Sequence, residues 1–126
     1  MSSINEAYVN YETALLLKGK GFEQSGCLKR YNTSGDLVEG FAYGPVAPTQ
    51  QMAMRWLREV HNLSIVVDCY NDSTDYEEHG PDIEYYITYH WKVVPFIGMS
   101  HSTGDEFASY EEAAEAAIKY TLENLI

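Results

Sequence analysis

Apolar residues recur with helical spacing in three segments of the chain. The first segment, Tyr11–Lys18, follows Asn10, whose side chain can accept a hydrogen bond from a free backbone N–H at a helix start. The second segment, Thr49–Val60, has apolar residues at positions i, i+3, i+4 and i+7. The third begins at Ser109, which can form a capping box with Glu112. The spacing predicts three amphipathic helices.

Two segments in the first half of the chain have the composition of strands. A cluster of turn-forming residues, 32–36, separates Cys27–Tyr31 from Leu37–Tyr43, which predicts an antiparallel hairpin. The glycine and the two prolines of residues 44–48 predict irregular structure until Thr49.

Two further strands are expected in the second half. Leu63–Tyr70 contains a β-branched run, and Ile83–Trp91 alternates between two sets of side chains. Val93–Ile97 either continues this strand or forms a short edge strand, since it contains a proline. The polar and acidic residues 71–82 predict a connecting loop.

The predicted element order is α-β-β-α-β-β-α. Neighbouring strands with short connections favour antiparallel pairing, and amphipathic helices bury their apolar stripes against a sheet. We therefore expect an α+β fold with one mostly antiparallel sheet of about four to five strands and three helices. A length of 126 residues fits one globular domain over residues 1–126.

The formal charge of −11 is concentrated in the second half of the chain. Residues 1–60 contain six acidic and six basic residues, whereas residues 61–126 contain thirteen acidic and two basic residues. Such a charge distribution repels phosphates, so direct binding of nucleic acid is not expected. The surplus acids serve either solubility or attraction to a basic partner surface.

No targeting or membrane segment is expected, because the first ten residues are polar and the apolar runs are short. Cys27 and Cys69 lie outside any paired motif, which suits a reducing compartment. We expect a cytoplasmic protein that does not bind membranes, located in the host cytoplasm if a phage encodes it.

No metal, cofactor or catalytic residue is predicted. The acidic loop does not follow the calcium-loop pattern, because Thr74, Tyr76 and Glu77 occupy the third, fifth and sixth positions, where Asp or Asn and a glycine are expected. The four histidines do not have the spacing of a helical zinc site. The chain also has neither a strand–turn–helix elbow around a serine nor a glycine-rich phosphate loop.

One candidate ligand site lies at the start of the second helix. Free backbone N–H groups at a helix start attract anions, and Thr49, Gln50 and Gln51 add side-chain donors there. Arg55 and Arg58 follow further along, so a phosphate or carboxylate is the expected ligand. The alternative is an ordinary capped helix with two surface arginines.

The eleven tyrosines suggest a candidate interface, since tyrosine supplies rigid contact area together with a hydroxyl. Tyr85 and Tyr89 are expected to face the core from one side of their strand. The other side offers Tyr86 and His90 to solvent or a partner, with Tyr76 nearby in the loop.

Three motifs of this chain resemble those of small uncharacterised proteins from Bacteroidetes genomes and their phages. They are residues 11–22, the segment from Ala47-Pro48-Thr49 to Trp56-Leu57-Arg58-Glu59, and Ser109-Tyr110-Glu111-Glu112-Ala113. The resemblance spans nearly the whole chain and is weakest over residues 68–101. It implies a phage or mobile-element origin and no particular activity.

The leading hypothesis is a non-catalytic binding protein of phage or prophage origin. It would engage a host protein or a small anionic ligand, and a homodimer is a candidate assembly. One alternative is an acidic decoy of nucleic acid that inhibits a host defence protein. A second alternative is a small hydrolase or nucleotide-processing enzyme, which requires a pocket gathering His79, His90 or His101 with carboxylates.

Overall fold

The computed structural model describes residues 6–22, 29–40, 42–73 and 84–126. Within these residues it contains three helices and five strands, all paired antiparallel, so the predicted α+β class is confirmed. The elements are α1 (Tyr11–Gly19), β1 (Lys29–Tyr31), β2 (Leu37–Glu39), β3 (Val46–Ala47), α2 (Gln50–His61), β4 (Leu63–Ser73), β5 (Tyr85–Pro95) and α4 (Tyr110–Asn124).

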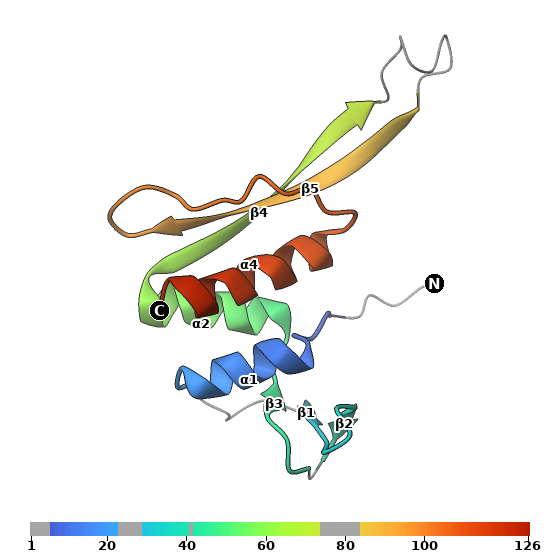
Figure 1. The fold of residues 1–126 in the computed structure, drawn as a ribbon, viewed down its shortest axis with the longest axis vertical. Coiled ribbons are helices and arrows are strands. Elements are labelled where there is room, and N and C mark those ends of the chain that lie inside the picture. The colour runs from blue at the N-terminus through green and yellow to red at the C-terminus, as the bar shows by residue number, and fades with distance from the viewer. Residues whose placement is uncertain (1–5, 23–28, 41, 74–83) are drawn as a thin grey trace.

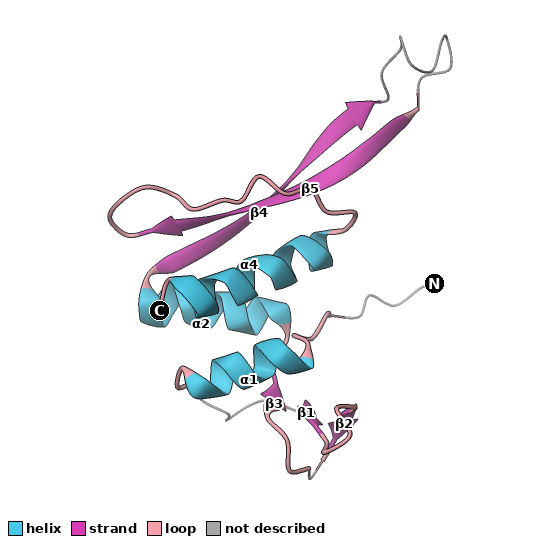
Figure 2. Ribbon diagram, viewed as in Figure 1, coloured by secondary structure: helices cyan, strands magenta, loops and turns pink. Residues whose placement is uncertain are grey.

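The strands form two separate sheets with the helices between them (Figure 1). One sheet has the order β2-β1-β3, and the other is the hairpin β4-β5. Helices α2 and α4 contact the hairpin, whereas α1 contacts β3 and α4. The expectation of one common sheet was therefore wrong. The reason is that α2 follows β3 almost directly and leads the chain to the other side of the helical layer (Figure 2).

Strand β3 lies in the segment predicted to be irregular. Proline lacks a backbone N–H but keeps its carbonyl, and Pro45 O accepts a 3.0 Å hydrogen bond from Tyr31 N. A Cβ atom on Gly44 would lie 2.1 Å from Tyr31 O, so glycine permits this close approach. Pairing with β1 therefore forms despite the two prolines. Strand β2 ends at Glu39, earlier than expected.

The predicted starts of all three helices are confirmed. Asn10 Oδ1 accepts a hydrogen bond from Thr13 N at 2.9 Å, and Thr49 Oγ1 accepts one from Met52 N at 3.2 Å. Ser109 caps α4 in the same way. Each cap is worth about 1 kcal/mol. The buried core lies among the helices and the sheet faces they cover, with four of its largest fully buried side chains being Leu17, Leu57, Ile118 and Leu122.

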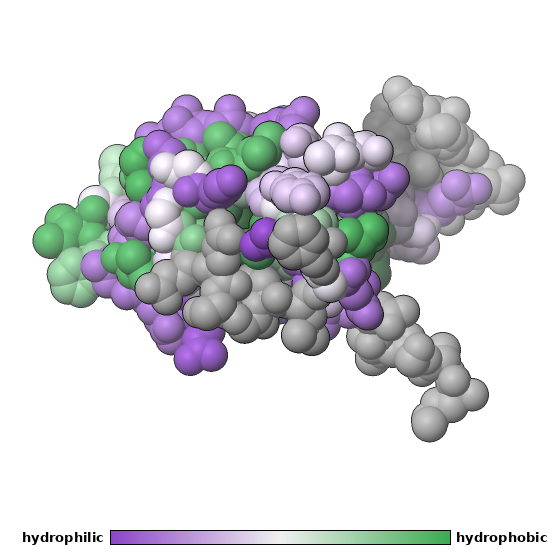
Figure 3. Space-filling model, turned by 90° about the horizontal axis from the view of Figure 1, so that it is seen from below, coloured by the Kyte–Doolittle hydropathy of each residue, from purple (hydrophilic) through white to green (hydrophobic). Residues whose placement is uncertain are grey.

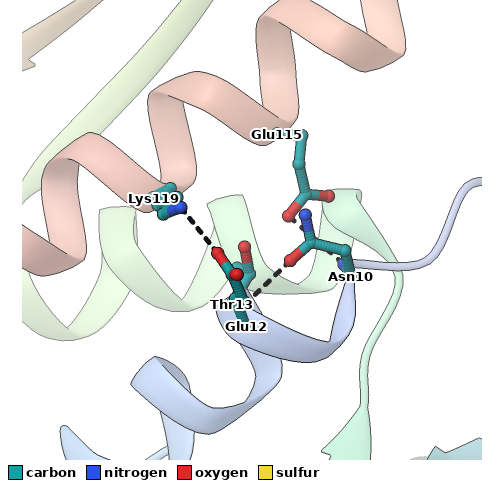
Figure 4. Close-up of polar contacts among 5 residues, drawn as sticks. All are labelled: Asn10, Glu12, Thr13, Glu115 and Lys119. Carbon is teal, nitrogen blue, oxygen red and sulfur yellow. Dashed lines mark hydrogen bonds and ion pairs between the residues drawn. The ribbon is translucent and has the colours of Figure 1, made fainter. Parts of the chain in front are cut away.

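Polar contacts join the starts of α1 and α2 to α4, and Figure 4 shows those between α1 and α4. Lys119 Nζ lies 2.7 Å from Glu12 Oε2, and this bond and charge lower the pKa of Glu12 and raise that of Lys119. Glu115 accepts from Asn10 N through Oε2 and from Gln50 Nε2 through Oε1, each at 3.2 Å. One carboxylate of α4 thus positions both other helices.

Candidate functional site

The hairpin β4-β5 is longer than the helices beneath it. Each strand has 11 residues and the pairing runs without offset from Leu63↔Pro95 to Ser73↔Tyr85. Such strands span about 36 Å, whereas the 15 residues of α4 span about 22 Å. The far end of the hairpin therefore projects past the helical layer (Figure 1). We call residues 69–73 and 85–87 the distal hairpin, and all of them are exposed.

The distal hairpin exposes four large side chains. Tyr85 is 72% exposed, Ile87 and Tyr70 are each 55% exposed, and Tyr86 is 45% exposed. The expectation that Tyr85 faces the core was wrong. Tyr85 does share a strand face with the buried Trp91 and Val93, but α4, whose N-terminal end lies nearest, does not extend beneath that position (Figure 1).

The outer face of the hairpin, away from the helices, holds the predicted interface residue His90. Its ring meets that of Tyr70 edge-on with centroids 4.9 Å apart, and its Nε2 lies 3.0 Å from Thr88 Oγ1. Asp68 pairs with His90 in the strand register. A hollow of about 320 Å³ opens beside Asp68, Tyr70 and His90 and is also lined by Lys92 and Ser102.

The residue types Asp68, His90 and Thr88 resemble a nucleophile with its base, but their geometry does not fit that chemistry. No hydrogen bond joins Asp68 to His90 among the described contacts, and Thr88 is only 7% exposed. Nucleophilic catalysis requires an oriented base and an accessible nucleophile. The contacts instead fix the His90 ring against the sheet.

Of the other predicted interface residues, Tyr86 is exposed, on the same face of the strand as His90. Tyr76 lies outside the described residues. Two exposed contributors that the alternation pattern missed are Tyr85 and Ile87. The signal that could have found them is the length of the strand compared with that of the last helix.

The predicted anion-binding residues at the start of α2 make hydrogen bonds within the chain. Gln50 N donates to Ala7 O at 2.8 Å, and Gln50 Nε2 donates to Glu111 O at 2.9 Å as well as to Glu115. Thr49 and Gln50 are both buried. Gln51 Nε2 donates to the Tyr110 hydroxyl at 3.2 Å.

The two arginines of this predicted site have other neighbours. Arg55 Nε lies 3.0 Å from Glu59 Oε1 on the surface of α2. Arg58 lines a hollow together with Pro95 and Phe96, near the opposite end of the helix. The structure therefore does not bring Thr49, Gln50, Gln51, Arg55 and Arg58 together around one ligand.

A second exposed apolar group follows β5 in a turn. Phe96, Ile97 and Met99 are between 82% and 87% exposed. The sequence predicted a strand through Ile97, whereas β5 ends at Pro95. Figure 3 shows hydrophobic residues at the left end of the molecule, where this turn lies in Figure 1.

Comparison with models of known protein families, with curated proteins and with solved structures finds no match to this chain. Within the described residues, no three side chains of the metal-ligating types converge on a common point. No described helix is long and apolar enough to cross a bilayer.

Proposed function

We propose that this protein is a non-catalytic protein-binding module whose contact surface is the distal hairpin. The observation that supports the proposal is the projection of this ribbon beyond the helices with Tyr70, Tyr85, Tyr86 and Ile87 exposed. Aromatic side chains are enriched where proteins meet. Those of the distal hairpin stand on two faces of one ribbon, which a partner can reach from either side.

The energetics of a ribbon favour this proposal. A two-stranded hairpin without a covered face is marginally stable in water, because it buries little apolar surface against its ordering entropy. The part of β4-β5 over α2 and α4 has such a cover, with Trp91 and Val93 buried there. The distal hairpin has none among the described residues. A bound partner would supply it.

The other predicted functions have less support. The internal bonds of Thr49 and Gln50 disfavour a small anion at the start of α2. The described acids of the second half are divided among the hairpin, the loop before α4 and α4 itself, which disfavours one continuous decoy surface. A phage origin and a host protein as the partner stay predictions.

The experiment compares a distal-hairpin variant with a matched surface variant. Tyr85→Ser/Ile87→Ser removes exposed apolar area from the distal hairpin, and Val60→Ser removes it from the exposed surface of α2. Each tagged protein is used for affinity capture from a lysate of the bacterial host, after circular dichroism has shown native folding. We expect a protein retained by the wild type and Val60→Ser to be lost with the double variant. Equal capture by all three would contradict the proposal.

A further inference from the structure

Beside the helices, one edge of the hairpin is already occupied by the chain itself. Tyr89 and Phe107 exchange two backbone hydrogen bonds of 2.9 Å, and Val93 and His101 do the same. The segment after β5 thus runs back along the outer side of β5. The backbone groups of Tyr89 and Val93 consequently point away from β4.

The opposite edge, along β4, is open. In an antiparallel ladder, the backbone N–H and C=O groups of alternate residues point toward the paired strand and away from it. When the groups of one residue point away, those of the residue opposite it also point away. Cys69 pairs with Tyr89, so its N–H and C=O point away from β5, as do those of Val67 and Asn71. No described backbone group bonds to these three residues.

Strand β4 lacks most of the features that protect an open edge. Natural edge strands are blunted by proline, by charged side chains (lysine above all) or by a bulge, and the charges of β4 are two aspartates, which repel acidic strands only. The 11 residues of β4 contain neither proline nor lysine, and their pairing with β5 has no bulge. The open edge is therefore competent to pair with a further strand.

The negative charge around β4 favours an added strand that is basic. Asp68 and Asp72 lie on the same face of β4, on either side of Tyr70. Residues 68–73 and 84–90 contain no lysine or arginine. A second copy of the chain would bring a charge of −11 against another −11, whereas a basic segment is attracted.

We infer that a basic, extended segment of a partner protein adds as an antiparallel strand to the outer edge of β4, an inference that rests on the proposed function of the distal hairpin. The backbone of the segment bonds to Val67, Cys69 and Asn71. Its side chains opposite Asp68 and Asp72 are lysine or arginine, four residues apart. The side chain between them is apolar and packs on Tyr70.

The test uses fluorescently labelled peptides that contain the sequence Lys-Thr-Val-Thr-Lys. The threonines take the positions whose N–H groups face β4, so N-methylation of the threonines blocks pairing and N-methylation of the lysines and valine does not. By fluorescence anisotropy we expect about a tenfold or greater loss of affinity for the first peptide, as two lost hydrogen bonds imply, and less than about a threefold loss for the second. Equal losses would overturn the inference.

Variants of the protein supply the second measurement. Asn71→Pro removes an outward N–H without removing a bond to β5, and Asn71→Ala keeps that N–H. We expect Asn71→Pro to lower the affinity of the unmodified peptide several-fold and Asn71→Ala to leave it unchanged. Asp68→Asn/Asp72→Asn should also lower the affinity, and the loss should be larger at low salt than at high salt. Equal binding of a peptide with glutamate in place of lysine would overturn the inference, as would a stable dimer of the protein in sedimentation.

The two proposals fail in different ways. If the protein captured from lysate depends on Tyr85 and Ile87 but not on the Asn71→Pro change, the distal hairpin binds through its side chains and strand addition is wrong. If capture depends on neither, the proposed function is wrong as well.

Discussion

Tyr89 and Phe107 are joined by two backbone hydrogen bonds of 2.9 Å, one in each direction. This pair fills the β5 edge beside the helices and shows that the N–H and C=O groups of Tyr89 point away from β4. Cys69 lies opposite Tyr89, so the backbone N–H and C=O groups of Val67, Cys69 and Asn71 point away from β5 and toward solvent. A contact near the helices thus shows which backbone groups of β4 point outward along the hairpin.

Hydrogen exchange reports this difference directly. We expect the amides of Tyr89 and Val93 to be protected, since they donate to Phe107 O and His101 O. The amides of Cys69 and Asn71, on the paired strand, are expected to exchange close to the rate of an unstructured peptide. The measurement is amide exchange by NMR on the isolated protein. Strong protection at Cys69 and Asn71 would mean that the β4 edge is covered in the protein alone.

The second prediction concerns Gln50 as a structural residue. Its side chain is buried and donates to Glu111 O and Glu115 Oε1. Gln50→Ala leaves these acceptors without that donor and should lower the free energy of unfolding by about 1–2 kcal/mol. Urea denaturation measures the loss. Gln51→Ala is the control, because Gln51 is exposed and should change stability little.

A titration with phosphate tests whether the same residues bind an anion. The amide resonances of Gln51 and Met52 should not move when inorganic phosphate is added at constant ionic strength. A saturable shift at these amides, together with unchanged stability of Gln50→Ala, would restore the anion site at the start of α2.

The third prediction follows from the buried hydroxyl of Tyr31. It donates to Val9 O at 2.6 Å, and burial together with the nearby charge of Glu115 raises the pKa of Tyr31 above 10. The folded state therefore holds this proton more tightly than the unfolded state. The stabilisation is complete below pH 10 and is lost as pH rises through the folded pKa.

Urea unfolding of the wild type and of Tyr31→Phe tests this account. Near neutral pH the variant should be less stable by about 1–2 kcal/mol, because Val9 O loses its partner. Above pH 10 the difference in stability between the two proteins should shrink as the tyrosine ionises. A constant difference from pH 8 to beyond 10 would be incompatible with the raised pKa.

The fourth prediction concerns the ion pair that links α1 to α4. The hydrogen bond and charge of Lys119 lower the pKa of Glu12 below 4.5. Its contribution to stability is therefore present above that pH and is lost as pH falls through the folded pKa. In Lys119→Met the pKa of Glu12 should rise toward 4.5, as measured by NMR titration of the side-chain carboxyl. An unchanged titration would show that Lys119 does not contact Glu12 in solution.

Local features of the fold were predictable from the sequence because they depend on neighbouring residues. Asn10, Thr49 and Ser109 cap helices through side chains that reach a backbone N–H three residues away. Asn62 ends α2 in the left-handed conformation, with a φ of 56°. Each of these choices is made within one helical turn.

Features that depend on distant segments were not predictable in this way. The exposure of Tyr85 follows from the length of α4, which lies more than 20 residues later in the chain. The pairing of β3 depends on the carbonyl of Pro45, although proline usually argues against a strand. The separation into two sheets depends on the path of α2 across the helical layer. The spacing of apolar residues along the sequence does not predict any of these relationships.

The most direct test of the central claim is photo-crosslinking with p-benzoylphenylalanine at position 85 of β5, in the cells that naturally contain the protein. The matched control has the same residue at position 60 of α2, where Val60 is also exposed. We predict that the protein with the probe at position 85 forms a covalent adduct with a defined partner and that the control does not. The absence of an adduct at position 85, or the same adducts from both positions, would contradict the assignment of the distal hairpin as the binding surface.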